Sequence, residues 1–224
     1  AGMIRARDGA LIQLCDATDG GTGNSAVHLS RDSGRTWNEL GSDIRGIHAA
    51  AAALADGRWL AFGRGREIDG RMPMSVSADR GTTWQYAASE FPGIGAAQRL
   101  VLLRLREGPL LLVSFSGPGD GAQGIMCCDL DGRAFNGVGM FAALSYDEGE
   151  TWAARKLLTP GDGAFETGPY FGAKVRRPPV VRTTPTQAEM EGYLAATQTP
   201  DGVIHLISSR LYYRFNLAWL ADGS

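Results

Sequence analysis

Apolar residues along this chain fall into short runs that are separated by turn-forming residues. Four of the junctions are an acidic residue followed by glycine, namely Asp8-Gly9, Asp56-Gly57, Glu107-Gly108 and Asp201-Gly202. They join apolar or alternating runs, as in HAAAAALADGRWLAFGR and QRLVLLRLREGPLLLVSFS. A turn of this kind between two such runs is typical of a β-hairpin. The pattern therefore predicts an all-β chain built from repeated hairpins.

A second repeat, Ser-x-Asp-x-Gly-x-Thr-Trp, occurs three times without a mismatch. Its copies are Ser30–Trp37, Ser77–Trp84 and Ser145–Trp152, and each follows a short apolar strand. In such a segment the Asp carboxylate can accept backbone N–H bonds across a turn, and the Gly supplies a positive φ. The Trp is then expected to pack flat between neighbouring sheets. We call each copy an Asp-box and interpret it as the tip of a hairpin.

Combining the two repeats gives a unit of strand, acidic-Gly turn, strand, loop, strand, Asp-box and strand. This is one four-stranded antiparallel blade of a β-propeller. Units begin near residues 3, 46, 98 and 192. The third unit is lengthened by a Gly-rich insertion, Gly117–Gly137. A longer excursion, Pro160–Met190, contains VRRPPVVRTTPT, which cannot be a central strand.

The count of blades is about four, but the first and last are incomplete. The first unit lacks most of its innermost strand, and the last unit stops after its third strand. Three explanations are open at this point: strands from the two termini complete one blade, the chain is a piece of a larger propeller, or subunits complete each other.

These repeats resemble the sialidase (neuraminidase) superfamily, and the chain is similar to bacterial proteins of the BNR/Asp-box type. The stretches GIHAAAAALADGRWLAFGRG, DGRMPMSVSADRGTTW and GYLAATQTPDGVIHLISSRLYYRFNLAWL carry the resemblance. It implies a single sialidase-like β-propeller domain over residues 1–224, incomplete at its N-terminus if the six blades typical of the family are needed. It also implies an exo-α-sialidase type of glycoside hydrolase that acts on an anionic terminal sugar.

Composition narrows the range of partners. The formal net charge is −2, which argues against a global basic field for nucleic acid or an anionic membrane. No apolar run approaches the roughly 20 residues of a membrane helix, and no signal peptide is visible. The three cysteines and three histidines show no zinc-ligand spacing, so we expect no metal and no cofactor. Because the net charge provides no general attraction for anions, an anionic ligand must be held by local arginines.

Candidate site residues can be indexed from the acidic-Gly turns. Eight residues before the acidic position lie His48, Arg99 and Tyr193. Eight or nine residues after it lie Asp16, Arg64, Ser116 and Arg210. Antiparallel pairing places both rows at the same end of the blades. The indexing therefore predicts that arginines, a tyrosine, an aspartate and a histidine point toward one shared centre.

The resemblance assigns roles to these positions. It gives the substrate carboxylate to a clamp of Arg64, Arg99 and Arg210, and the role of nucleophile to Tyr193. The glutamate that activates the tyrosine is Glu166 or Glu191. Asp69, in the loop GRGREIDGRM, and Asp16 compete as the general acid, and His48 is expected to hold a sugar hydroxyl.

Two other interpretations remain at this point. The chain could be a non-catalytic carbohydrate-binding or interaction propeller, since a fold hosts many functions. It could also form a homo-oligomer through open propeller edges, because exposed edge strands pair readily with another chain. A glycan or sialoside is the expected small-molecule partner, and we expect neither nucleic acid nor membrane.

Overall fold

The computed structural model describes residues 3–6, 8–16, 23–117, 124–129, 131–167 and 179–222. Four sheets in this part of the chain are blades. Blade 1 contains β1 (Ile4–Arg5), β2 (Leu11–Asp16), β3 (Ser25–Ser30) and β4 (Asn38–Ile44). Blade 2 contains β5 (Ile47–Ala53), β6 (Trp59–Arg64), β7 (Arg71–Ser77) and β8 (Gln85–Pro92). Blade 3 contains β10 (Val101–Arg104), β11 (Leu110–Ser116), β14 (Gly139–Ser145) and β15 (Ala154–Leu157). Blade 4 contains β19 (Ala195–Gln198), β20 (Ile204–Ile207) and β21 (Tyr212–Phe215), and the short helix α1 (Leu217–Ala221) follows it.

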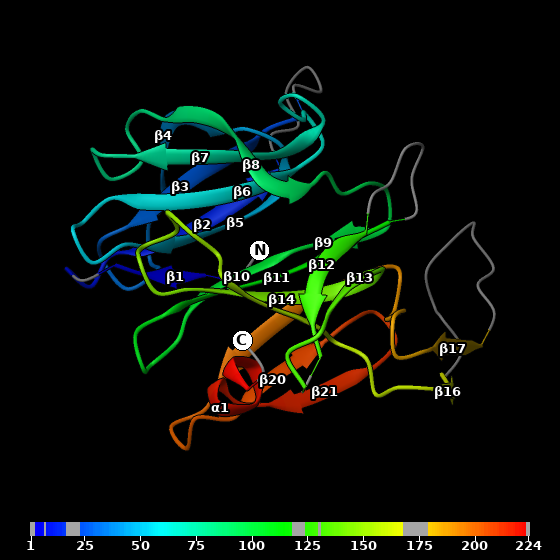
Figure 1. Cartoon of the computed structure of the whole chain (residues 1–224). Helices are drawn as coiled ribbons and strands as arrows, with labels where there is room; N and C mark the ends of the chain where they lie inside the picture. Colours follow the sequence, from blue (N-terminus) through cyan, green and yellow to red (C-terminus); the bar gives the residue numbers. More distant parts are fainter. Residues whose placement is uncertain are drawn as a thin grey trace.

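The prediction of a β-propeller with antiparallel blades is confirmed. Strands within each blade pair in chain order, and inner strands of successive blades lie side by side: β2 with β5, β5 with β10, and β10 with β19 (Figure 1). The two incomplete blades are also as predicted, since β1 has two residues and blade 4 has three strands. In the described part of the chain β1 pairs only with β2 and β21 only with β20. Strands from the two ends therefore do not share one sheet there, which removes the first of the three explanations for the incomplete blades.

Both long interruptions form small sheets outside the blades. The insertion in blade 3 contains the hairpin of β12 (Ile125–Cys128) and β13 (Ala134–Gly137). The excursion before blade 4 contains β16 (Gly163–Glu166) paired with β17 (Val180–Thr183). Strand β17 thus lies in a two-stranded sheet, in agreement with the prediction that its proline-rich surroundings exclude it from a blade.

The three Asp-boxes have one hydrogen-bonding pattern. In the first, Asp32 Oδ1 accepts bonds from the Ser30 hydroxyl and the Thr36 N–H, at 2.8 and 2.9 Å, and Asp32 Oδ2 accepts the Thr36 hydroxyl at 2.7 Å. Asp79 and Asp147 make the corresponding bonds in the other two boxes. These bonds satisfy the polar groups of a turn whose backbone takes positive φ values.

Two of the three Asp-box tryptophans pack toward the blade that precedes their own. Trp152 of blade 3 is 3% exposed and lies 5.9 Å, ring to ring, from Phe62 of blade 2. Trp84 of blade 2 packs against the core that blades 1 and 2 share. Trp37 belongs to blade 1, which no described blade precedes, and it is 38% exposed. The expectation that every Asp-box tryptophan packs between sheets is therefore wrong for Trp37 within the described residues.

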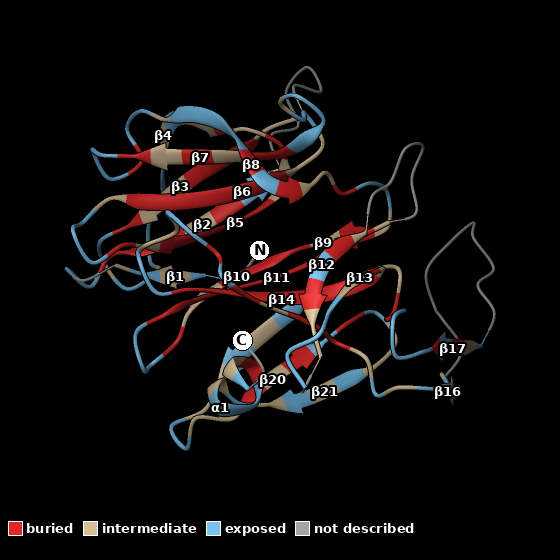
Figure 2. Cartoon of the chain, viewed as in Figure 1, coloured by how far each residue is buried: buried red, intermediate tan, exposed pale blue. Residues whose placement is uncertain are grey.

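Burial is greatest in the middle strands of blade 3 and least in the outer strands of blades 1 and 2. All residues of β11 and β14 are buried, whereas β4 and β8 carry mostly exposed or half-buried residues (Figure 2). Strand β5 faces two ways: Ala50 and Ala52 belong to the large core with blade 3, and Ala49 and Ala51 to a smaller core with blade 1. Small side chains on this strand let both neighbouring blades approach it closely.

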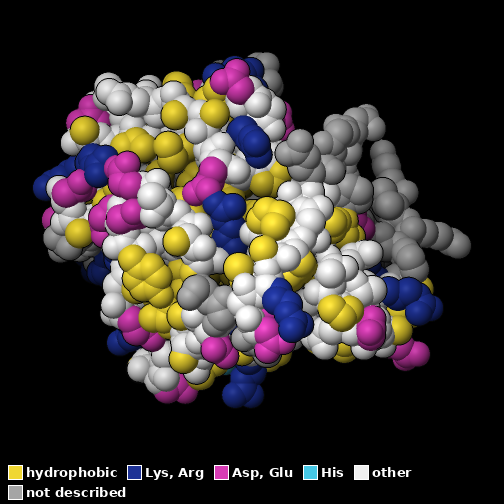
Figure 3. All heavy atoms as spheres, viewed as in Figure 1, with side chains coloured by type: hydrophobic (Ala, Val, Ile, Leu, Met, Phe, Trp, Pro, Cys, Tyr) yellow, Lys and Arg dark blue, Asp and Glu magenta, His cyan; other side chains and the backbone are white. Residues whose placement is uncertain are grey.

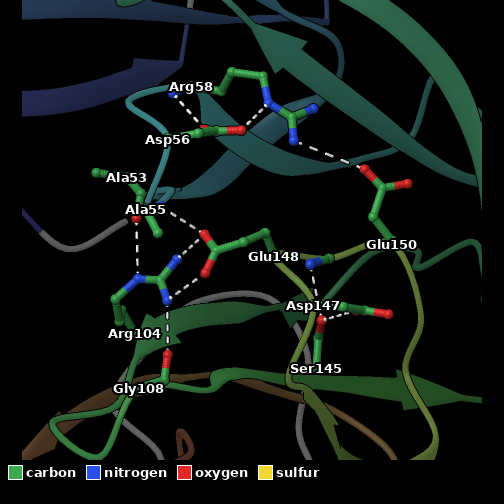
Figure 4. Close-up of polar contacts among 11 residues, drawn as sticks. Ala53, Ala55, Asp56, Arg58, Arg104, Gly108, Ser145, Asp147, Glu148 and Glu150 are labelled. Atoms are coloured by element: carbon green, nitrogen blue, oxygen red, sulfur yellow. Dashed lines mark hydrogen bonds and ion pairs between the residues drawn. The ribbon is translucent and has the colours of Figure 1, made fainter.

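A cavity of about 500 Å³ lies between the inner strands. Residues of β1, β5, β10 and β19 line it, with Arg99 at one end and Arg104 at the other. Arg104 lies on the Asp-box side, where it bonds to Glu148 (Figure 4). Arg99 marks the opposite end of the blades, and the predicted site residues lie there.

Candidate functional site

Five of the predicted site residues meet at the end of the blades that lies away from the Asp-boxes. Asp16 is the last residue of β2, His48 the second residue of β5, and Arg64 the last residue of β6. Arg99 and Tyr193 come from β9 (Gln98–Arg99) and β18 (Gly192–Tyr193). Blades 1 and 2 and the two-stranded sheet of β9 and β18, whose strands directly precede the inner strands of blades 3 and 4, therefore all contribute to one cluster.

Tyr193 and Arg99 are adjacent because β18 and β9 pair in parallel. Their register places Tyr193 opposite Arg99 and Gly192 opposite Gln98. Backbone bonds from Gly192 N–H to the Ala97 carbonyl, at 2.9 Å, and from Leu194 N–H to the Arg99 carbonyl, at 3.3 Å, hold this pairing. The Tyr193 N–H donates to the Ser209 hydroxyl at 2.9 Å, so its backbone is fixed from blade 4 as well.

The hydroxyl of Tyr193 lies between a donor and a histidine nitrogen. Arg64 Nη1 donates to it at 3.3 Å, and His48 Nε2 lies 3.3 Å away on another side. The guanidinium carbons of Arg99 and Arg64 lie 4.9 and 5.8 Å from the centre of the phenol ring. Tyr193 is 41% exposed, so the phenol is accessible to a ligand despite these contacts.

His48 is held by Asp16 through both its backbone and its ring. The His48 N–H donates to Asp16 Oδ1 at 2.6 Å, and His48 Nδ1 lies 2.7 Å from Asp16 Oδ2. The φ of His48 is +54°, in the left-handed region that non-glycine residues seldom adopt. Burial and the charges of Arg64 and Arg99 lower the pKa of His48, and they outweigh the opposing charge of Asp16. These effects together favour the neutral form of the imidazole.

The two arginines of the cluster make contacts with uncharged groups. Arg64 Nη1 also donates to the Gln98 carbonyl at 3.0 Å, and Arg99 Nη2 lies 3.3 Å from His48 Nδ1. Arg99 Nε is buried without a hydrogen-bond partner among the described residues. Guanidinium groups with this arrangement are suited to a carboxylate, which can accept two parallel N–H bonds.

The remaining candidates come from four other segments of the chain. Asp69 is exposed at the tip of a tight turn closed by backbone bonds between Ile68 and Arg71, and its φ is +51°. Glu166 is exposed at the end of β16, in the small sheet outside the blades. Glu191 precedes Tyr193 by two residues and is half-buried. Arg210 lies near Glu189, whose ionised form its charge favours. The roles of these four residues stay predictions.

Three residues in and around the site were not singled out from the sequence. Gln98 links the strands, because its side chain donates to the Met190 carbonyl at 2.9 Å and accepts the Gly95 N–H at 2.8 Å. The sequence feature that could have identified Gln98 is its position directly before Arg99. Glu189 accepts a 2.9 Å bond from the Tyr213 hydroxyl, and burial raises the pKa of both groups. Nothing in the sequence repeat points to this pair, because it joins the excursion before blade 4 to that blade's last strand.

Neither metal ligands nor membrane helices are found in the described residues. There, no group of three or more His, Cys, Asp or Glu side chains is placed to hold a metal ion. Within these residues the one helix, α1, has five residues, and none is long and apolar enough to cross a membrane. On the face shown in Figure 3, acidic and basic side chains lie beside one another rather than forming one basic patch.

Comparison with known proteins gives one family and several related folds. The family model described as a BNR repeat-like domain matches residues 2–206. A search of curated proteins found no match.

Solved structures with a similar fold share little sequence with this chain. A protein of unknown function from Dyadobacter fermentans aligns with a TM-score of 0.55 at 14% identity, over 95% of this chain and 50% of its own. The K499G mutant of NanB sialidase from Streptococcus pneumoniae aligns with a TM-score of 0.55 at 15% identity, over 98% of this chain and 28% of its own. A bifunctional GH43-CE protein of Bacteroides eggerthii aligns with a TM-score of 0.51 at 9% identity, over 95% of this chain and 23% of its own. The chain thus spans half or less of each of these proteins, and the likeness concerns the fold.

Proposed function

The chain belongs to the family of BNR repeat-like domains, and from this premise we propose that it is a glycoside hydrolase of the exo-α-sialidase type. Its substrate would be a glycan that ends in an anionic sugar. The observation that carries the proposal is the accessible Tyr193 phenol in contact with Arg64, Arg99 and His48.

In this proposal the arginines bind the sugar carboxylate. Arg64 and Arg99 approach the phenol from two sides, and Arg210 is the third member of the clamp. Charge-assisted, bidentate bonds to a carboxylate are stronger than neutral hydrogen bonds and fix the orientation of the sugar. They would hold the anomeric carbon near the hydroxyl of Tyr193, which acts as the nucleophile.

A phenol suits this substrate better than a carboxylate would. A carboxylate nucleophile would repel the anionic sugar, whereas a neutral tyrosine would not, and sialidases differ from most glycosidases in using a tyrosine.

The general acid is assigned to Asp69. Asp16, the competing candidate, has Oδ1 bonded to the His48 N–H and Oδ2 against the His48 ring, so neither oxygen is directed to a substrate. Asp69 is exposed on the loop that follows Arg64. For this residue to protonate the leaving oxygen, that loop must bring it over the bound sugar.

A non-catalytic carbohydrate-binding propeller is the second candidate. It is favoured by the position of Asp69, which lies in a turn and not in the cluster. Binding alone would need the arginines and not the Tyr193 hydroxyl.

The test is release of the fluorophore from 4-methylumbelliferyl-sialic acid by the parent chain, by Tyr193→Phe and by Tyr146→Phe. Tyr146 is 63% exposed in the third Asp-box and serves as the matched control. Turnover that is lost in Tyr193→Phe and kept in Tyr146→Phe supports the hydrolase. Absence of turnover with sialic acid binding that Arg99→Gln abolishes would support the binding propeller instead. Absence of both from folded protein contradicts the proposal.

A further inference from the structure

The tyrosine of the site has a histidine beside its hydroxyl, where the resemblance to sialidases leads one to expect a glutamate. The described contacts of the Tyr193 hydroxyl are with Arg64 Nη1 and His48 Nε2, each at 3.3 Å. An arginine can only donate, so it bonds to a lone pair of the phenolic oxygen. The phenolic hydrogen is then free to point at His48.

The ring of His48 is in the form that can accept that hydrogen. Asp16 Oδ2 lies 2.7 Å from Nδ1, a distance that requires a hydrogen on Nδ1. In a neutral imidazole with its hydrogen on Nδ1, Nε2 is an acceptor. Arg99 Nη2 also lies 3.3 Å from Nδ1, but a nitrogen that already carries a hydrogen cannot accept another, so this approach is not a hydrogen bond.

We propose that His48, oriented by Asp16, is the base that takes the proton of Tyr193. The chain of contacts runs from Asp16 on β2 through His48 on β5 to Tyr193 on β18, and so joins blades 1 and 2 to the strand that precedes blade 4. Asp16 is a positioning residue in this arrangement, because it fixes the backbone and the ring of His48 and does not reach the phenol.

The inference rests on the proposed function for the identity of the substrate. As the phenolic oxygen bonds to the anomeric carbon, its proton passes to His48 Nε2, and the bond to the leaving oxygen breaks with protonation by Asp69. Water then attacks the anomeric carbon and gives its proton to the Asp69 carboxylate. The bond between sugar and phenol breaks, and Tyr193 recovers its proton from His48.

The proton transfer can be measured without a sugar. N-acetylimidazole acetylates phenolic oxygens: the oxygen takes the acetyl group, and the released imidazole takes up the proton. Peptide mass spectrometry gives the rate at each tyrosine, and Tyr146, 63% exposed, is an internal reference. The variants are His48→Asn and Asp16→Asn, with His205→Asn as a matched control in blade 4. Asparagine is chosen because it tolerates the positive φ of position 48 better than other replacements.

The expected result is that Tyr193 of the parent reacts at least roughly tenfold faster than Tyr146 at pH 7.5, in the range of general-base effects. His48→Asn brings the ratio close to one, Asp16→Asn lowers it in part, and His205→Asn leaves it unchanged. In the parent, the ratio of the Tyr193 rate to the Tyr146 rate also decreases as the pH is lowered, because His48 becomes protonated. The groups that set this titration are Asp16, Arg99 and Tyr193, which contact the ring, and Arg64, whose charge acts on it.

A parent ratio near one would overturn the inference, as would a raised ratio that survives in His48→Asn. A ratio that collapses in Arg64→Gln but not in His48→Asn would assign the activation to the arginine and also overturn it. Because acetylation does not depend on sialoside turnover, a chain that hydrolyses no sialoside but shows the His48-dependent ratio refutes only the hydrolase. The converse result refutes only the role of His48.

Discussion

Glu148 of the third Asp-box accepts a 2.6 Å hydrogen bond from the backbone N–H of Ala55, 93 residues earlier in the chain and one blade away. Its carboxylate also bonds to the guanidinium of Arg104, at 3.0 and 2.5 Å, and Arg104 in turn donates to the Ala53 carbonyl (Figure 4). The Asp-box of one blade is thereby connected to the acidic-Gly hairpin of the preceding blade.

Replacing Glu148 by Gln is expected to destabilise the chain by about 1–3 kcal/mol, because Arg104 would lose its charged partner in a half-buried setting. Burial raises the pKa of Glu148, but the bonds from Arg104 and Ala55 lower it by more. The matched control is Glu150→Gln in the same Asp-box, whose carboxylate is 70% exposed and lies 3.8 Å from Arg58. Urea unfolding measures the stability of both variants. Equal losses of stability would contradict a specific role of Glu148 in pairing with Arg104.

Trp152 and Trp37 test the rule that an Asp-box tryptophan stabilises the chain where it packs on a preceding blade. Trp152→Ala should cost about 3–5 kcal/mol, since this side chain is buried against Phe62 and Phe91. Trp37→Ala should cost much less, because a large part of that ring is already in contact with water. The comparison requires only thermal or urea unfolding of the two variants, and a Trp37 variant as damaged as the Trp152 variant would refute the rule.

The Asp-box carboxylates should make stability depend on acid pH. Hydrogen bonds from the hydroxyl and N–H of Thr83, with a further bond from Ser77, lower the pKa of Asp79 to about 2. A folded-state pKa below the unfolded value means that the contribution is complete above about pH 4 and is lost as the pH falls through about 2. Asp79→Asn should therefore flatten the pH dependence of unfolding between pH 4 and 2. An unchanged slope would show that this carboxylate is not linked to folding.

The success of the sequence in predicting this architecture has a simple physical basis. An acidic-Gly turn and an Asp-box each fix the backbone locally, so counting from the turn gives the end of the blade at which a residue lies. This is why His48, Arg99 and Tyr193 could be predicted to converge although 145 residues separate the first from the last. The local repeat determines at which end of a blade a residue lies, and this repeat can be recognised in the sequence.

Side-chain partners within the cluster could not be predicted in the same way. The contact of Asp16 with both the backbone and ring of His48 depends on the positive φ of His48, which no turn motif announces. Glu189 and Tyr213 come from the excursion and the last strand, outside the repeat that provided the index. Glu166 was a candidate by residue type alone, and its segment forms a separate hairpin whose position the sequence did not specify.

Arg99→Lys provides the sharpest test of the carboxylate clamp. Lysine keeps the charge but loses the planar fork that binds a carboxylate through two parallel bonds, so the affinity for free sialic acid should fall about 10–100-fold, or about 1.4–2.8 kcal/mol. Arg58→Lys is the matched control, because Arg58 pairs with Asp56 at an acidic-Gly turn on the opposite end of the blade. Isothermal titration should show loss only in Arg99→Lys, and a neutral methyl galactoside should bind both variants and the parent alike. If Arg58→Lys weakens binding as much, the effect is one of overall charge, and Arg99 has no specific role in holding the carboxylate.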